Sequence, residues 1–155
     1  MNRRLFLVAS AALALAGPSV AAAAPRMLVS KSPTCGCCGA WVDHVRRAGL
    51  PVDVREMPDD ALYALKERLG IAPEHMSCHT AEIDGYVIEG HVPANDIARL
   101  LKERPRALGL SVPGMPVGSP GMEMGDRRDP FDTLLLGPNG TAAVFASHRG
   151  VSDES

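Results

Sequence analysis

Three of the four cysteines lie within one short run, Cys35-Gly36-Cys37-Cys38. Cys35 and Cys38 form a CxxC pair, which is typical of dithiol redox sites and of metal sites. The pair stands where a helix is expected to begin, and the helix dipole with its unpaired N–H groups favours the thiolate form. Cys37 adds a third sulfur that a dithiol redox site does not need. Because crowded thiolates repel one another, the run favours a bound cation over buried structural cysteines or a structural disulfide.

The fourth cysteine stands in the segment Met76-Ser77-Cys78-His79. If the hydrophobic pattern gives alternating strands and helices, this segment enters the third strand beside the start of the first helix. Cys78 would then join the three other sulfurs. Four thiols and imidazoles would then converge. A structural zinc site with four cysteines, or with three cysteines and a histidine, is the alternative, although the spacing lacks a second CxxC.

Thioethers and further imidazoles lie elsewhere in the chain. Met115, Met122 and Met124 lie in a Gly- and Pro-rich segment with little core to fill. Their sulfurs would favour Cu(I) or Ag(I) over zinc, unless they only fill gaps in packing. His44 shares a helix face with the cysteine run but lies about 10 Å further along the axis, so it needs a second ion or a surface role. His91 follows the fourth strand near the sheet end, where a histidine serves as a ligand or as a structural residue.

The hydrophobic pattern predicts the elements that position these residues. Short apolar or alternating runs predict strands, and stripes at helical spacing predict helices between them. Strands are expected at residues 27–30, 51–57, 80–83 and 86–89, with helices from the cysteine run to Gly49, from Asp59 or Asp60 to Gly70, and from Pro93 to Pro105. The order is βαβαββα, and a short crossover pairs the first two strands in parallel. It is the element order of the thioredoxin-like fold, which keeps reactive cysteines at the start of its first helix.

The last third of the chain is less regular. Pro and Gly alternate through residues 109–130, which predicts a long functional loop and argues against a central strand. Apolar runs at 131–136 and 141–147 flank Asn139-Gly140, which predicts a β-hairpin. The predicted fold is therefore α/β, a thioredoxin-like βαβαββα core with a C-terminal Met/Gly/Pro-rich loop and β-hairpin. It occupies a single domain at 25–150, with a tail at 151–155.

Residues 1–24 are expected to be a signal peptide. Arg3 and Arg4 precede an apolar stretch, and a run of alanines supplies a cleavage site. The adjacent arginines resemble a twin-arginine export signal, although ordinary secretory signals carry such pairs too; a membrane anchor is the remaining alternative. We therefore expect a periplasmic protein with no stable membrane anchor. The formal net charge of −2 gives no strongly basic surface, so nucleic acid is not expected as a partner.

Taken together, the motifs resemble CopG-type copper-resistance proteins. The resemblance extends over about residues 27–149 and rests on Cys35-Gly36-Cys37-Cys38-Gly39, Met76-Ser77-Cys78-His79-Thr80, Glu89-Gly90-His91-Val92-Pro93 and the methionine loop. It implies a periplasmic, thioredoxin-like protein that binds copper as a cysteine-bridged cluster of several ions, and interconversion of Cu(I) and Cu(II) has been proposed for this family. It implies copper ligands at Cys35, Cys37, Cys38, Cys78, His91, Met115, Met122 and Met124, with His44 and His79 as further candidates.

Two function classes remain open. The first is a periplasmic copper-binding resistance protein, which would also take silver, act as a metal oxidoreductase and meet other periplasmic copper-handling proteins. The second is a periplasmic thiol–disulfide oxidoreductase with Cys35 and Cys38 as its redox pair. Cys37 and Cys78 favour the first class, because extra neighbouring thiols would interfere with clean disulfide exchange.

Overall fold

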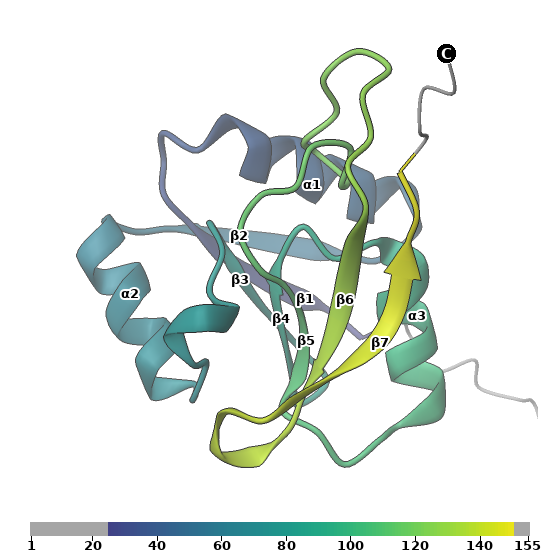
Figure 1. Cartoon of the computed structure of the whole chain (residues 1–155). Coiled ribbons are helices and arrows are strands. Elements are labelled where there is room, and N and C mark those ends of the chain that lie inside the picture. The colour runs from purple at the N-terminus through teal and green to yellow at the C-terminus, as the bar shows by residue number, and fades with distance from the viewer. Residues whose placement is uncertain (1–24, 151–155) are drawn as a thin grey trace, which may run out of the picture.

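The computed structural model describes residues 25–150, which adopt a mixed α/β fold (Figure 1). The strands are β1 (Met27–Lys31), β2 (Val52–Glu56), β3 (Thr80–Ile83), β4 (Tyr86–Gly90), β5 (Gly109–Val112), β6 (Phe131–Leu136) and β7 (Ala142–His148). The helices are α1 (Gly36–Arg47), α2 (Asp59–Arg68) and α3 (Ala94–Glu103), with short 3-10 turns η1 (Pro73–His75) and η2 (Pro138–Gly140). The predicted signal peptide at 1–24 and tail at 151–155 lie outside the described residues. Within the described range, no helix has the length and apolar character needed to cross a membrane.

The strands form one mixed sheet in the order β2-β1-β3-β4-β5-β6-β7. β1 pairs with β2 in parallel and β4 with β5 in parallel, while the other neighbours are antiparallel. The expected α/β class, the order βαβαββα and the parallel first pair are all observed. Both predicted hairpins are confirmed: β3 turns into β4 at Asp84-Gly85, and β6 turns into β7 through η2.

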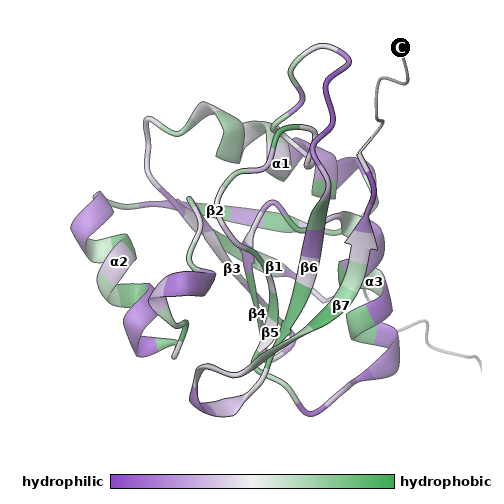
Figure 2. Cartoon of the chain, in the orientation of Figure 1, coloured by the Kyte–Doolittle hydropathy of each residue, from purple (hydrophilic) through white to green (hydrophobic). Residues whose placement is uncertain are grey.

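Different helices cover the two faces of the sheet. On one face, α1 and α3 pack in a hydrophobic core that includes Ala81 of β3 and Ile88 of β4. Because side chains alternate along a strand, the neighbouring pair of Thr80 and Glu89 faces the other side, where Lys66 of α2 contacts both. In Figure 2, hydrophobic and hydrophilic residues alternate around α2 and α3, as expected for helices with one face on a sheet.

Strand β5 corrects part of the sequence prediction. The pattern predicts a loop throughout residues 109–130, but Gly109–Val112 form a buried strand between β4 and β6, and the loop is confined to 113–130. Leu110 and Val112 enter the hydrophobic core. A Cβ on Gly109 would collide with the backbone of Val87 in β4, so glycine is required for the two strands to approach. The strand has only four residues, too few to show a pattern beside the glycines and prolines that follow.

Candidate metal centre

The start of α1 carries the cysteine run. Cys35 is the N-cap of α1, and no side chain caps the helix there, so the positive end of the helix dipole lies beside the sulfurs. Cys35 and Cys38 are joined by a disulfide, whereas Cys37 and Cys78 are free. The Sγ atoms of Cys35 and Cys37 are 3.4 Å apart. The thiol of Cys37 therefore lies in contact with the predicted redox pair.

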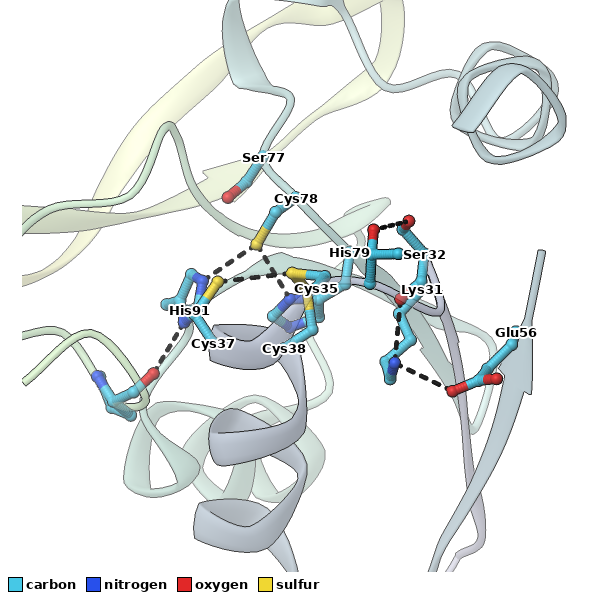
Figure 3. The surroundings of a disulfide bond; sticks show 12 residues. Lys31, Ser32, Cys35, Cys37, Cys38, Glu56, Ser77, Cys78, His79 and His91 are labelled. Atoms are coloured by element: carbon cyan, nitrogen blue, oxygen red, sulfur yellow. Dashed lines mark hydrogen bonds and ion pairs between the residues drawn. A yellow bond between two sulfur atoms is a disulfide. The ribbon is translucent and has the colours of Figure 1, made fainter. Parts of the chain in front are cut away.

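The fourth sulfur comes from the segment just before β3 (Figure 3). β3 pairs antiparallel with β1, and the chain leaving β1 leads into the cysteine run, so strand pairing sets Cys78 beside the start of α1. The Sγ atoms of Cys35, Cys37, Cys38 and Cys78 all lie within 4.8 Å of one another. Because metal–sulfur bonds are about 2.3 Å long, sulfurs at this spacing can share an ion. The structure thus brings together the four cysteines that the sequence analysis predicts to be ligands.

Two histidines extend the donor set on the Cys78 side (Figure 3). The Cys78 Sγ lies 3.0 Å from His91 Nε2 and 3.4 Å from His79 Nδ1. The other His91 nitrogen, Nδ1, lies 2.8 Å from the carbonyl oxygen of Pro120, which can only accept a hydrogen bond. His91 Nδ1 therefore carries the proton of the neutral ring, and Nε2 turns its lone pair toward Cys78. This is the tautomer and orientation that a metal-binding imidazole needs.

Burial sets the protonation state of the site. It raises the pKa of Cys78 to about 12, with a further rise from Cys37, so Cys78 without a cation is a thiol at neutral pH. Burial also lowers the pKa of His91, and it lowers the pKa of His79 well below its ordinary value. Both imidazoles are therefore neutral. His79 Nε2 is buried with no hydrogen-bond partner among residues 25–150. Neutral imidazoles, with thiols that release protons to a metal, form a donor set suited to a soft cation.

The remaining predicted ligands are placed differently. His44 Nε2 accepts a hydrogen bond from the Ala94 N–H at the start of α3, over 3.1 Å, and His44 belongs to neither group of close donors. Met115 and Met124 are exposed by 51% and 63%, and Met122 is half-buried. The fold therefore uses the ring nitrogen of His44 to satisfy a helix terminus, and it leaves two thioethers open to solvent.

The loop of residues 113–130 contacts the site through its backbone. Gly121 lies so close to α1 that a Cβ there would stand 2.7 Å from the backbone nitrogen of Trp41 and 2.8 Å from the backbone oxygen of Cys37. The preceding residue, Pro120, supplies the carbonyl that binds His91. A backbone carbonyl has no signature in the sequence, so this contact to a candidate ligand was not predictable from residue types.

Two buried charges behind Cys78 were also not anticipated. Lys66 Nζ and Glu89 Oε1 lie 2.6 Å apart, and the same carboxylate oxygen accepts a hydrogen bond from the Ser77 N–H. The sequence did carry a signal, because Lys66 lies on the apolar stripe of its helix between Leu62 and Leu69, and Glu89 interrupts an apolar strand. A charged residue at a core-facing position needs a buried partner.

Known proteins resemble this chain in sequence and in structure. The family model described as "Protein of unknown function, DUF411" matches residues 75–122, which include Cys78 and His91. No curated protein matches the sequence. Two solved structures named "Copper resistance protein copG", Form 1 and Form 2, are 46% and 44% identical to it, each with a TM-score of 0.74 over 81% of this chain and 98% of their own. By this identity over nearly their whole length, the chain belongs to the CopG copper-resistance family.

Proposed function

We propose that this protein is a copper-binding protein of copper resistance that holds Cu(I) on its four clustered cysteines, with nitrogen ligands from His79 and His91. The observation that carries the proposal is the convergence of four Sγ atoms within 4.8 Å of one another. Thiolates select soft cations such as Cu(I) and Ag(I), and the names of the similar structures point to copper rather than zinc. Sulfur bridging allows several ions in one cluster, with the thioethers of Met115, Met122 and Met124 as further ligands.

The proposed setting is the periplasm. A signal peptide at residues 1–24 would export the protein, and a single thioredoxin-like domain at 25–150 would carry the site. The order βαβαββα and the CxxC pair at the start of α1 support the thioredoxin-like assignment. In an oxidising compartment free thiols tend to form disulfides unless a metal or a reductant holds them. Copper bound to Cys37 and Cys78 would protect them there, and other periplasmic copper-handling proteins are the expected partners.

The disulfide suggests that the site also interconverts Cu(I) and Cu(II). Reduction of the Cys35–Cys38 disulfide takes up two electrons and two protons and yields two thiols, which completes the set of four sulfur ligands. Two Cu(I) ions that each give up one electron supply that pair and become two Cu(II) ions; the reverse reaction reforms the disulfide. Thiolates prefer Cu(I), whereas the imidazoles of His79 and His91 tolerate Cu(II), so a mixed site can hold either state.

A thiol–disulfide oxidoreductase is the second candidate function. The observation in its favour is the Cys35–Cys38 disulfide at the N-terminus of α1, where a thiolate leaving group is stabilised. Against it, the Cys37 Sγ lies 3.4 Å from the Cys35 Sγ. A third thiol at this distance can attack a mixed disulfide with a substrate before the proper partner does.

Paired cysteine variants separate the two functions. We expect Cys37→Ser/Cys78→Ser to lose most of its Cu(I) and Ag(I) stoichiometry, because two of the four clustered cysteines are gone. The measurement is anaerobic titration of the fully reduced protein with elemental analysis, including a Zn(II) titration for the structural-zinc alternative. Retention of full copper stoichiometry by this variant would contradict the ligand set.

The complementary variant is Cys35→Ser/Cys38→Ser, which removes the redox pair and keeps the other two thiols. If the protein were an oxidoreductase, reduction of insulin disulfides would persist in the Cys37→Ser/Cys78→Ser variant and vanish in this one. If it is a copper protein, both variants lose metal and neither shows substantial insulin reduction.

A further inference from the structure

A salt bridge lies buried behind Cys78, on the face of the sheet that α2 covers. The side chains of Lys66 and Glu89 are exposed by only 5% and 0%, and their charged atoms are 2.6 Å apart. Thr80, which faces Glu89 across the β3–β4 pair, donates a hydrogen bond to Glu89 Oε2 over 2.6 Å and accepts one from Lys66 Nζ over 2.7 Å. The three side chains form a buried cluster of polar contacts.

Stability alone is a weak reason for such a pair. Removing two charges from water is costly, and replacement of a buried ion pair by apolar residues of similar size is often neutral or stabilising. The carboxylate has one more partner, because Glu89 Oε1 accepts a hydrogen bond from the Ser77 N–H over 2.6 Å. Hydrogen bonds to a buried charge are among the stronger ones in proteins.

Ser77 is fixed from several sides at the end of β4. Its hydroxyl donates to the carbonyl of Gly114 in the loop. A Cβ at Gly90 would stand 2.5 Å from both the Ser77 Cβ and the Ser77 Oγ, so only glycine lets Ser77 approach the strand this closely. The next residue in the chain is Cys78, the one cysteine of the four that does not lie in the run at the start of α1. The backbone of Cys78 is thus held at its N-terminal side by the buried carboxylate.

We propose that Glu89, held in place by Lys66, is the positioning residue that sets Cys78 against the sulfurs of α1. This inference rests on the proposed metal-binding function of the four-cysteine site. The three other cysteines share one helix turn, whereas the position of Cys78 depends on the hydrogen bonds of its own segment. The alternative is that the ion pair only fastens α2 to the sheet and has no effect on the thiol.

Two double variants both lack the ion pair and differ in whether residue 89 can still form hydrogen bonds. In Lys66→Met/Glu89→Gln the charges are gone, but the amide oxygen still accepts from Ser77 and the amide nitrogen donates to Thr80. In Lys66→Met/Glu89→Met the side chain keeps its length and loses the acceptor. Glu82→Gln, on the same hairpin and half exposed, is the control for a simple loss of carboxylate. Circular dichroism and thermal melting would check that each protein is folded.

The first readout needs no metal. In a Cys37→Ser background with the disulfide intact, Cys78 is the one free thiol of the chain, and its rate of alkylation by iodoacetamide reports how firmly its segment is held. We expect the Glu89→Met double variant to react about tenfold faster than its Glu89→Gln counterpart, as the loss of a hydrogen bond within a charged or polar cluster would give. The Glu82→Gln protein should react at the unchanged rate.

The second readout is Ag(I) affinity of the reduced proteins with all four cysteines present. We expect about a tenfold loss for Lys66→Met/Glu89→Met and recovery of binding in Lys66→Met/Glu89→Gln. Equal alkylation rates in the two folded double variants would overturn the positioning role. Failure of the unsubstituted protein to bind Ag(I) would instead overturn the proposed function, while the alkylation result would still decide whether Glu89 holds Cys78.

Discussion

Replacement of Gly121 by alanine tests whether the loop of residues 113–130 prepares His91 for metal. Gly121 has a φ of +85°. A Cβ there would stand 2.7 Å from the backbone nitrogen of Trp41 and 2.8 Å from the backbone oxygen of Cys37. Both atoms belong to the backbone of α1, so neither can move aside alone. We therefore expect the loop to lift from α1 and to withdraw the carbonyl of Pro120 from His91.

The magnitude of the effect has two parts. A left-handed backbone at a residue with a Cβ costs about 1–2 kcal/mol, and Gly125→Ala carries this cost as well, because Gly125 has a φ of +59° and no atom within 4 Å of an added Cβ. Only Gly121→Ala adds the collision with α1. Loss of the hydrogen bond that orients a metal-binding histidine typically costs about 10–100-fold in metal affinity. This factor should separate the two alanine variants.

The assay is competitive Ag(I) titration of the reduced proteins, with NMR of the His91 ring nitrogens to follow the tautomer. We expect Gly125→Ala to bind Ag(I) like the unsubstituted protein and to keep the proton of His91 on Nδ1. Gly121→Ala should bind about 10–100-fold more weakly and show a mixture of tautomers. Equal Ag(I) affinities in the two variants would refute the inference that the loop orients His91.

Three further predictions concern the dependence of stability on pH, the contact between His148 and Asp96, and the exposed thioethers. Burial, followed by the charges of nearby His91 and Lys66, lowers the pKa of His79 in the folded protein well below 6.5. At a pH below about 6.5 the unfolded chain therefore binds more protons than the folded one, so the metal-free protein should lose stability as the pH falls below that value. In urea unfolding, His79→Phe should make this loss of stability with falling pH smaller. His148→Ala removes a 2.8 Å contact with Asp96 and should cost about 1 kcal/mol of unfolding free energy without changing Ag(I) stoichiometry, whereas a change in stoichiometry would link β7 to the site. Met115→Leu/Met124→Leu replaces side chains with little packing to lose, so it should leave the melting temperature unchanged and weaken Ag(I) binding; unchanged binding would remove these thioethers from the ligand set.

Local sequence patterns were enough for most of the fold around the site. The Asp84-Gly85 and Asn139-Gly140 turns fix two hairpins, because each supplies a left-handed backbone between apolar runs. Apolar stripes marked the three helices. The exception was Gly109–Val112, whose strand character depends on the neighbours β4 and β6 rather than on its own residues. A strand of this length is decided by the sheet that accepts it.

The candidate metal site likewise depends partly on the local sequence and partly on the tertiary structure. The sequence alone determined the chemistry of the donors, since thiol and imidazole side chains and the spacing of the CxxC pair are properties of residue type and local order. Tertiary structure decided their geometry: antiparallel pairing of β3 with β1 brings Cys78 to α1, and contacts with Glu89 and Pro120 hold Ser77 and His91. Such contacts join residues far apart in the chain, often through backbone atoms. No local pattern records them, because they exist only once the sheet has assembled.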